Sequence, residues 1–317
     1  MALLLTLTLG AQERIRCMSY NVENLFDYID DPQTNDNEFL PQATRHWTRN
    51  RYWNKLHAIS RVIAMVGDDR APDLVALCEV ENDSVMYDLT RRSSLRTARY
   101  EYLMTSSNDP RGIDVALMYK PTTFHPFSCR SLRLPKEHNP EGRHVRDILL
   151  VSGELVTGDT LDLLVCHLPS RLGGERSERM RHSIVQYMCR AVDSLCCERE
   201  VPRIVLMGDF NDNHKSHTLR PLAEKAGLTC ITGNLNGSYR YKGKWEQIDL
   251  VYLSPALLDA ENGVGLSPSG AWVYRAPHLM ESETVYGGVR PRRTYNGMRY
   301  EGGASDHLPV CFDLWYW

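Results

Sequence analysis

Short apolar runs alternate with polar clusters along most of the chain, and several runs follow one another without a helix between them. Residues 100–119 and 146–167 each carry consecutive strand-like runs of this kind. Two other stretches have apolar residues at helical spacing, and they predict helices between the first two strands and after His167. Their apolar positions are Trp53, Leu56, Ile59, Ile63 and Val66, then Met180, Ile184, Val185, Met188, Val192 and Leu195. Strand-like runs that outnumber helices predict mixed sheets rather than a doubly wound sheet.

The chain is long enough to bury one large hydrophobic core. It has 317 residues, of which 42% are hydrophobic, and its polar clusters are spread too evenly for two independent catalytic domains. We therefore expect an α/β fold of the mixed α+β kind, formed by one domain over residues 13–317. No internal repeat or low-complexity segment stands out in the sequence.

One polar cluster directly follows a run that predicts a buried strand. The apolar residues 204–206 lead into Met-Gly-Asp-Phe-Asn-Asp-Asn at 207–213, which places Asp209 and Asn211 two residues apart just past the strand. Both side-chain oxygens can then face one point, where a hard cation and a phosphate oxygen can share them. Glycine, asparagine and aspartate also stabilise turns, so this cluster alone supports a metal site and a simple turn equally.

Five further polar clusters stand where a strand-like run begins or ends. They contribute Asn21 with Glu23, then Glu79, His167, Asp249, and the pair Asp306 and His307. A single aspartate or histidine beside a strand is more often a hydrogen-bonding or capping residue than a catalyst. Several such clusters in one chain are harder to explain in that way, and they predict a shared site of carboxylates, amides and imidazoles.

At these residues the chain resembles the endonuclease/exonuclease/phosphatase superfamily of deoxyribonuclease-like phosphoesterases, over about residues 15–315. The resemblance implies a four-layer sandwich, in which two packed β-sheets are flanked by helices and the site lies at one end. It also implies roles for the matching residues. Asn21 and Glu79 match metal-site residues of the family, and Glu23 matches a secondary metal-site acid. Asp209 and Asn211 match its Gly-Asp-x-Asn pair, and Asp306 and His307 match its terminal Ser-Asp-His. Asp249 matches a buried acid, and His167 matches a residue that contacts the phosphate.

The resemblance leaves two assignments open for the water that attacks the phosphorus in phosphodiester hydrolysis. In one, His307 is the general base or orients the water, and the Asp249 carboxylate holds its ring and raises its basicity. In the other, Asp209 orients the water and His307 binds the phosphate. The sequence does not decide between them.

The cofactor implied by the resemblance is Mg²⁺, with Mn²⁺ as the second choice. Glu79 and Asn21, together with Asp306 or Glu23, would hold the ion through few protein ligands and leave positions for water and substrate. This all-oxygen ligand set argues against zinc, which favours nitrogen and sulfur ligands.

Three further residues are candidates for the region around the substrate phosphate: Arg146, Arg171 and Asp114. Asp114 could be the carboxylate that supports His167, although strand alternation also allows a solvated edge residue. Arg146 resembles an arginine that reaches the phosphate in some family members, and a surface ion pair with Asp147 is the competing interpretation. Arg171 stands in a glycine-containing turn after His167 that could present it to a phosphate.

Long connections are expected to shape the mouth of the site. Residues 27–46 carry several acids without the spacing of a calcium-binding loop, which favours a solvated loop. Residues 263–303 combine arginines with tyrosines, a mixture that suits phosphate binding and base stacking as well as a well-ordered surface loop. Residues 237–245 have the pattern of a hairpin and leave the same two interpretations.

The formal net charge of −3 gives no global basic field of the kind that many nonspecific DNA-binding proteins use, although local basic loops could still dock a phosphate backbone. The first hypothesis is a metal-dependent hydrolase that cleaves phosphodiesters, with nucleic acid as the first candidate substrate. The second is a phosphatase or phospholipase-C-like enzyme for a phosphorylated small molecule or phospholipid head group. A non-catalytic binding protein on the same fold is disfavoured because the whole set of site residues is present. No protein partner is predicted.

Residues 3–11 form a short apolar run that ends in small residues, like the end of a signal peptide cleaved after Ala11. A charged segment before it is missing, so a leading strand is the competing interpretation, and the run is too short to span a bilayer. We expect a periplasmic or secreted protein, with a cytoplasmic location as the alternative. The nine cysteines do not decide this, because Cys78 and Cys166 lie in strand-like runs and an odd number cannot pair completely.

Overall fold

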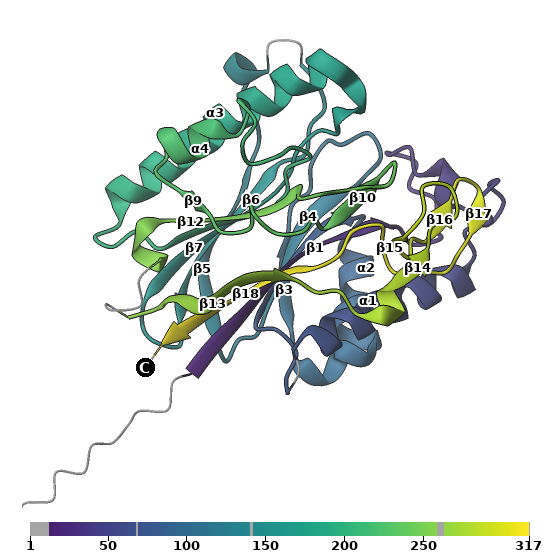
Figure 1. Ribbon diagram of the computed structural model, residues 1–317, viewed down its shortest axis with the longest axis horizontal. Coiled ribbons are helices and arrows are strands. Elements are labelled where there is room, and N and C mark those ends of the chain that lie inside the picture. Colours follow the sequence, from purple (N-terminus) through teal and green to yellow (C-terminus); the bar gives the residue numbers. More distant parts are fainter. Residues whose placement is uncertain (1–12, 68, 140–141, 259–262, 317) are drawn as a thin grey trace, which may run out of the picture.

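The computed structural model describes residues 13–67, 69–139, 142–258 and 263–316. Two six-stranded sheets pack face to face and carry helices on their outer faces, which gives four layers (Figure 1). This is the mixed α/β sandwich that the sequence predicts. The apolar run at 3–11, interpreted as the end of a signal peptide, lies outside the described residues. Within the described ranges, no helix combines the length and apolar character that crossing a membrane requires.

The first sheet is built around a parallel pair of strands. β1 (Glu13–Leu25) and β2 (Leu74–Val80) run parallel, and helix α1 (Arg49–Val66) connects them. A parallel pair needs such a crossover because both strands start at the same end of the sheet. The other strands pair antiparallel, in the order β13-β18-β1-β2-β4-β3, and comprise β3 (Glu101–Met104), β4 (Asp114–Tyr119), β13 (Gly265–Val273) and β18 (Val310–Tyr316).

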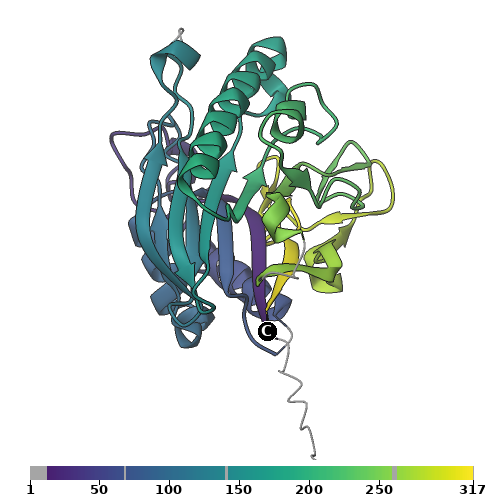
Figure 2. The ribbon, with the colours of Figure 1, turned by 90° about the vertical axis from the view of Figure 1, so that its left-hand side faces the viewer.

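The second sheet repeats this arrangement. β7 (Thr160–His167) and β8 (Ile204–Asp209) are its parallel pair, and the long helix α3 (Gly174–Glu198) connects them. α3 lies over the strands of this sheet (Figure 2). The remaining strands are antiparallel, in the order β5-β6-β7-β8-β12-β9, and comprise β5 (Phe124–Leu132), β6 (Ile148–Leu155), β9 (Thr229–Cys230) and β12 (Asp249–Leu253).

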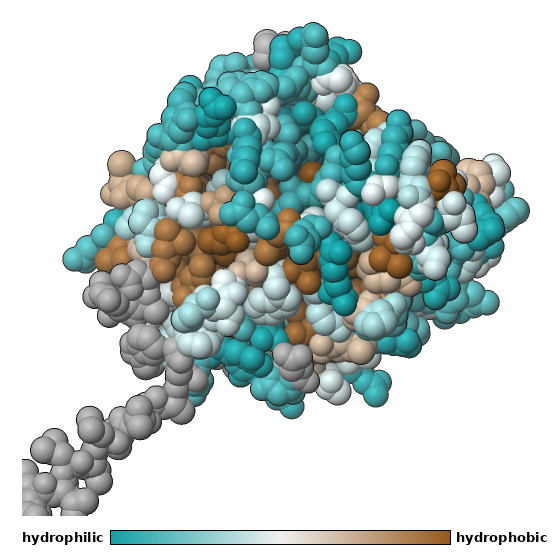
Figure 3. All heavy atoms as spheres, viewed as in Figure 1, coloured by the Kyte–Doolittle hydropathy of each residue, from teal (hydrophilic) through white to brown (hydrophobic). Residues whose placement is uncertain are grey.

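Apolar side chains fill the spaces between the four layers. Leu74 and Ala76 of β2 point into the space between the two sheets, whereas Val75 and Leu77 of the same strand pack under α1. Because β2 is buried on both faces, its sequence is a continuous apolar run rather than an alternating one. The apolar residues of α3 pack on the outer face of the second sheet in the same way, which leaves the surface over this helix hydrophilic (Figure 3).

The two helices predicted from apolar spacing are α1 and α3. α1 starts after Thr48, whose hydroxyl accepts a hydrogen bond from the Arg51 N–H and caps the helix. Two shorter helices, α2 (Asp83–Tyr87) and α4 (Arg220–Glu224), lie in the connections. Short 3₁₀ or π segments also occur there: η1 (Asn37–Phe39), η2 (Asp88–Arg92), η3 (Ser94–Ala98), η4 (Lys136–His138), η5 (Arg171–Gly173), η6 (Pro255–Leu257) and η7 (Pro277–Leu279).

Two-stranded hairpins lie beside one end of the sandwich (Figure 1). The first of them is the hairpin predicted for residues 237–245. They pair β10 (Tyr239–Tyr241) with β11 (Lys244–Glu246), β14 (Met280–Ser282) with β15 (Val289–Pro291), and β16 (Tyr295–Asn296) with β17 (Arg299–Tyr300).

The connection at 27–46 is only partly the solvated loop that its acids suggest. Asp27 and Asp36 are buried, and their carboxylates accept hydrogen bonds from backbone N–H groups of the same loop. The Phe39 ring stacks on Phe26, with 4.2 Å between the ring centroids. Aromatic packing therefore holds this loop against the domain, and the acidic composition gave no sign of it.

The nine cysteines are all free thiols. Cys78 and Cys166 are buried, as their places in strand-like runs predict. Burial raises the pKa of both thiols well above the ordinary value, so neither is a reactive thiolate at neutral pH.

Gly208, the residue before Asp209, lies on β8 directly beside the backbone of Cys166 on β7. Its φ is 145°, and a Cβ added there would lie 1.9 Å from the Cys166 carbonyl oxygen. We expect Gly208→Ala to lower the free energy of unfolding by about 3 kcal/mol or more, because a backbone clash adds to the strain of this conformation. Urea unfolding followed by circular dichroism measures the change.

Gly158→Ala is the matched control for this substitution. Gly158 also has a positive φ, of 85°, but a Cβ there meets nothing within 4 Å. Gly158→Ala should therefore lower the free energy of unfolding by only about 1 kcal/mol, which is the cost of the backbone conformation alone. Equal losses in the two variants would contradict the role assigned to the close approach.

Candidate active site

The ends of the two parallel strand pairs meet in one cleft. In the second sheet, His167 of β7 is paired with Asp209 of β8, which is paired in turn with Asp249 at the start of β12. In the first sheet, Asn21 of β1 lies beside the end of β2, which carries Glu79. The Asn21 amide links the sheets, because its Nδ2 donates to Asp209 Oδ2 at 2.9 Å and lies 3.3 Å from Glu79 Oε1. The polar clusters that end the strand-like runs therefore converge.

Irregular backbone aims some of these side chains into the cleft. The β1–β2 register shifts after Asn21, and Glu79 (φ 68°) and Asn211 (φ 51°) adopt left-handed conformations. Such conformations cost about 1–3 kcal/mol each in non-glycine residues, and they cluster at functional sites. Hydrogen bonds hold both residues in place. The Asn24 N–H donates to Glu79 Oε2 at 2.7 Å, and Asn211 Nδ2 donates to the Leu168 carbonyl at 3.0 Å.

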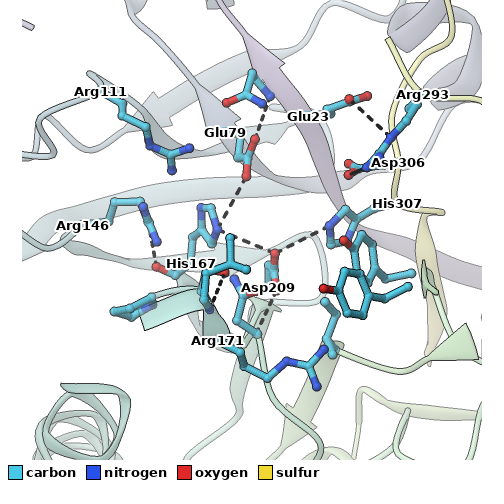
Figure 4. A pocket seen from close by; sticks show the side chains of 18 of the residues that line it. Glu23, Glu79, Arg111, Arg146, His167, Arg171, Asp209, Arg293, Asp306 and His307 are labelled. Carbon is cyan, nitrogen blue, oxygen red and sulfur yellow. Dashed lines mark hydrogen bonds and ion pairs between the residues drawn. The ribbon is translucent and has the colours of Figure 1, made fainter. Parts of the chain in front are cut away.

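Asp209 is buried at the centre of the site, between two histidines (Figure 4). Its Oδ2 lies 3.6 Å from His167 Nε2 and 3.9 Å from His307 Nε2. Its Oδ1 accepts a hydrogen bond from the Asn211 N–H at 2.8 Å. Burial, and then the charge of the neighbouring Asp249 carboxylate, raises the pKa of Asp209 to about 7. Asp209 can therefore take up or release a proton near neutral pH.

A second buried carboxylate holds His307. The Nδ1 atom of His307 lies 2.7 Å from Asp249 Oδ2, and the Tyr239 ring packs on the imidazole with centroids 4.7 Å apart. Burial alone would lower the pKa of His307, but the Asp249 and Asp209 carboxylates outweigh burial and hold the pKa well above its usual range. His307 is therefore an imidazolium that faces Asp209.

His167 has the opposite character. It is buried, and burial together with the positive charges of Arg146 and Arg111 holds its pKa well below the usual range. The imidazole is therefore neutral at neutral pH, and its Nε2 lies 3.8 Å from Glu79 Oε1. Its Nδ1 is buried and has no hydrogen-bond partner in the part of the chain that the structure describes.

Asp114 does not supply the supporting carboxylate for His167, and neither is it a solvated edge residue. It is buried on β4, where its Oδ1 accepts hydrogen bonds from the Thr105 hydroxyl and from the Ser107 N–H. It lines a neighbouring hollow instead of the cleft between the histidines. A register shift between β2 and β4 places Asp114 opposite Val80, beyond the point where regular alternation applies.

Arg146 lines the cleft, but its partners differ from both interpretations of the sequence. Its Nη1 lies 2.8 Å from Asp109 Oδ2, and its other nitrogens donate to the carbonyls of His167 at 2.9 Å and Leu168 at 3.1 Å. Asp147, the expected ion-pair partner, pairs elsewhere. Arg146 therefore fixes the backbone around His167 and lowers the pKa of that histidine by its charge.

The cleft has a volume of about 880 Å³, which suits a ligand of the size of a nucleotide or a phospholipid head group. Arg171 lines it, as its place after His167 predicts, and pairs with Glu246. Arg111 and Tyr239 also line it. The motifs did not point to Arg111, because it comes from a loop whose approach to the cleft depends on tertiary packing. Tyr239 belongs to the predicted hairpin at 237–245, for which phosphate binding and base stacking were one of the two interpretations.

The arginines of residues 263–303 are held mainly by contacts within that segment. Arg290 pairs with Glu281 at 2.8 Å, and Arg299 pairs with Glu301 at 2.7 Å. Arg293 instead lines the cleft. Most of these arginines therefore support the interpretation of a well-ordered surface loop rather than that of a binding surface for a phosphate backbone.

The carboxylates of the site suit a divalent cation. The ligand atoms of Asp209, Asp249 and His307 lie within 4.8 Å of one another. The pKa of Glu23, like that of Asp209, is raised to about 7, here by burial and then by the neighbouring Asp306 carboxylate. Repulsion of this kind is relieved by a positive charge among the carboxylates, either a hard divalent cation or a basic side chain. The carboxylates concerned are Glu23, Glu79, Asp209, Asp249 and Asp306.

Two packed sheets, outer helices and a cleft of acids and histidines at the strand ends define a deoxyribonuclease-like phosphoesterase fold. The chain belongs to the Endonuclease/Exonuclease/phosphatase family, whose sequence profile matches residues 16–315. Members of this family are hydrolytic phosphoesterases that use divalent metals. No curated protein matches the chain in sequence.

Solved structures share the fold at low sequence identity. TDP2 from D. rerio, in complex with a single-strand DNA product, matches with a TM-score of 0.61 at 14% identity, over 95% of this chain and 98% of its own. The human nocturnin catalytic domain with a bound sulfate anion matches with a TM-score of 0.60 at 14% identity, over 96% of this chain and 94% of its own. An endonuclease/exonuclease/phosphatase family protein from Bacteroides thetaiotaomicron matches with a TM-score of 0.61 at 15% identity, over 96% of this chain and 98% of its own.

Asp249→Asn should lower the pKa of His307. Without the carboxylate, burial is opposed only by more distant charges, so the imidazole should lose its proton at lower pH. The folded protein gains stability from the pair below about pH 6.5, the ordinary histidine value, and loses it as the pH rises through the higher folded-state pKa. The variant should lose this pH dependence. Titration of the His307 resonance by NMR in EDTA measures the shift.

Asp159→Asn is the control for this prediction, because Asp159 pairs with Arg203 at the opposite end of the second sheet. It should leave the His307 titration unchanged. An unchanged titration in Asp249→Asn would show that Asp249 does not govern the charge of His307.

Proposed function

We propose that the protein is a divalent-metal-dependent phosphoesterase that hydrolyses phosphodiester bonds, with nucleic acid as the first candidate substrate. The observation that carries the proposal is the place of Asp209, between the neutral His167 and the protonated His307. Hydrolysis of a phosphodiester requires a group that takes a proton from water, and positive groups or N–H donors that face the phosphoryl oxygens. The cleft contains both kinds of group.

The protonation states favour the second of the two assignments for the attacking water. Because Asp249 keeps His307 protonated, His307 is suited to contact a phosphoryl oxygen and not to accept a proton. Asp209, with a pKa of about 7, is suited to orient the water and take its proton. The neutral His167 can donate a hydrogen bond from Nε2 to another oxygen of the same phosphate.

The metal-binding role is proposed for Glu79, with Asn21 beside it. The Glu79 carboxylate suits Mg²⁺ or Mn²⁺, and Asn21 holds it beside Asp209, because Asn21 Nδ2 donates towards both carboxylates while its Oδ1 accepts the Glu23 N–H. A bound divalent cation supplies positive charge to a phosphoryl oxygen. At the rim, Arg111 and Arg171 would position further anionic groups of the substrate.

Nucleic acid is the first candidate because the cleft opens among basic and aromatic side chains such as Arg111, Arg171 and Tyr239. The fold is also the one on which TDP2 holds a single-strand DNA product. Export of the protein, predicted from residues 3–11, stays a prediction.

Exposed apolar side chains favour a second candidate, a phospholipid head group. Val285 and Tyr286, between β14 and β15, are 77% and 53% exposed. Met298, between β16 and β17, is 53% exposed, and it follows Gly297, which lines the cleft. Exposed apolar side chains on these hairpins, with Met298 next to the cleft, would suit contact with a lipid surface.

A panel of phosphate esters tests the proposal. It contains double- and single-stranded DNA, RNA, sphingomyelin vesicles, inositol phosphates and bis-(p-nitrophenyl) phosphate, each with Mg²⁺, Mn²⁺ or EDTA. We expect release of product that EDTA abolishes and added metal restores. Faster cleavage of vesicles than of nucleic acid would select the second candidate. No cleavage of any diester by folded protein, with either metal, would overturn the proposed function.

Asp209→Ala and His307→Ala should each lower kcat by about 100-fold or more, because each removes a group that acts on the reacting atoms. Asp212→Asn is the control, since Asp212 lies in the same turn as Asp209 but pairs with Arg181. Its kcat should stay close to that of the unmodified protein. Unchanged turnover in both alanine variants, measured on the best substrate of the panel, would contradict the mechanism.

A further inference from the structure

Two of the predicted metal ligands, Glu23 and Asp306, are already engaged by a basic side chain of the chain itself. The Arg293 guanidinium donates to Asp306 Oδ2, and its Nε lies 3.9 Å from Glu23 Oε1 (Figure 4). Arg293 therefore stands between the two carboxylates, at the place where they could otherwise share a cation.

The backbone around Arg293 is fixed to the same carboxylate and to α1. The Thr294 N–H donates to Glu23 Oε2 at 2.7 Å, and the Arg293 carbonyl accepts the Gly303 N–H at 3.1 Å. Behind them, the buried Lys55 of α1 donates to the Thr294 hydroxyl at 2.5 Å and to the Ala304 carbonyl at 3.2 Å. Because this segment is anchored on both sides, the guanidinium is held in place between the carboxylates.

The balance of charge differs between the two halves of the cleft. One half contains two carboxylates, Glu23 and Asp306, and two basic side chains, Arg293 and Lys55. The other half contains three carboxylates and two histidines, and among the described residues the ion pairs of these carboxylates are with the histidines alone. Arginine and lysine thus face the carboxylates of the first half, whereas the carboxylates of the second half are left to a divalent cation. The groups of the second half are Glu79, Asp209, Asp249, His167 and His307.

We propose that Arg293 takes the place of a second divalent cation, so that the chain binds one metal ion, beside Glu79 and Asp209, and none between Glu23 and Asp306. The inference rests on the proposed function, in which the Glu79 side of the cleft binds a divalent cation. It assigns Arg293 as a positioning residue that keeps Glu23 and Asp306 out of the metal's ligand set. It also explains why these two acids resemble metal ligands in sequence but face a guanidinium in the fold.

Counting bound Mn²⁺ tests the proposal without an activity assay. Isothermal titration calorimetry gives the stoichiometry, and electron paramagnetic resonance reports the spin coupling that appears when two Mn²⁺ ions lie close together. The unmodified protein should bind one ion. Arg293→Met removes the charge while keeping a long side chain, and it should gain a second, coupled ion. Arg293→Lys keeps the charge and should remain at one.

The control is Arg299→Met, because Arg299 is exposed and pairs with Glu301 away from the cleft. It should also bind one ion. If Arg293→Met does not fold, single substitutions of the acids still decide the matter. Glu79→Gln should weaken Mn²⁺ binding by more than about 10-fold, and Glu23→Gln by less than about threefold, because only Glu79 is a ligand.

Three results would overturn the inference. They are two ions in the unmodified protein, one ion in folded Arg293→Met, and a Glu23→Gln variant that loses Mn²⁺ affinity as Glu79→Gln does. No Mn²⁺ binding by the unmodified protein would instead overturn the metal dependence of the proposed function. The failure of the inference and the failure of the proposed function are therefore distinguishable.

Discussion

Electrostatic repulsion among carboxylates is the constraint on which this site depends. Five of them come from both sheets and from a loop. Asp209 and Asp249 are buried and the other three are half-buried, so little water screens their charges. His307, an arginine and a buried lysine are placed among them, and each is held by hydrogen bonds or ion pairs that fix where its charge lies. The same carboxylates give the site its chemistry: their attraction keeps His307 protonated, and burial together with the charge of Asp249 raises the pKa of Asp209 to about 7.

Holding like charges together requires a rigid frame, and the sandwich provides one at some local cost. Glu79 and Asn211 have left-handed backbones, and Gly208 lies where any side chain would collide with β7. These strained positions flank the cleft, whereas the strands that lead to them are regular and buried on both faces. The burial of the apolar layers thus offsets the free-energy cost of the strained backbone and the clustered charges at this end of the molecule.

The sequence predicted the part of the site that strands deliver. Asn21, Glu79, His167, Asp209 and Asp249 stand at the ends of apolar runs, and strand ends are local features that a run of residues reveals. It did not predict what depends on the course of connections. Arg111 gave no local signal, Asp114 is displaced by a register shift, and the partner of Arg146 comes from a loop distant in sequence. The acids of 27–46 looked solvated because composition does not show aromatic packing beneath them.

The parallel pairs β1–β2 and β7–β8 belong to different sheets. Nevertheless, Asn21 Nδ2 and Asp209 Oδ2 are only 2.9 Å apart across the space between the sheets. One residue of a strand spans about 3.3 Å, so sliding the sheets past each other by that amount would separate the two halves of the site. The apolar layer between the sheets therefore sets the width of the cleft as a spacer does. Its side chains touch no substrate, but their size and fit decide whether metal ligand, histidine and water can act on one phosphorus atom.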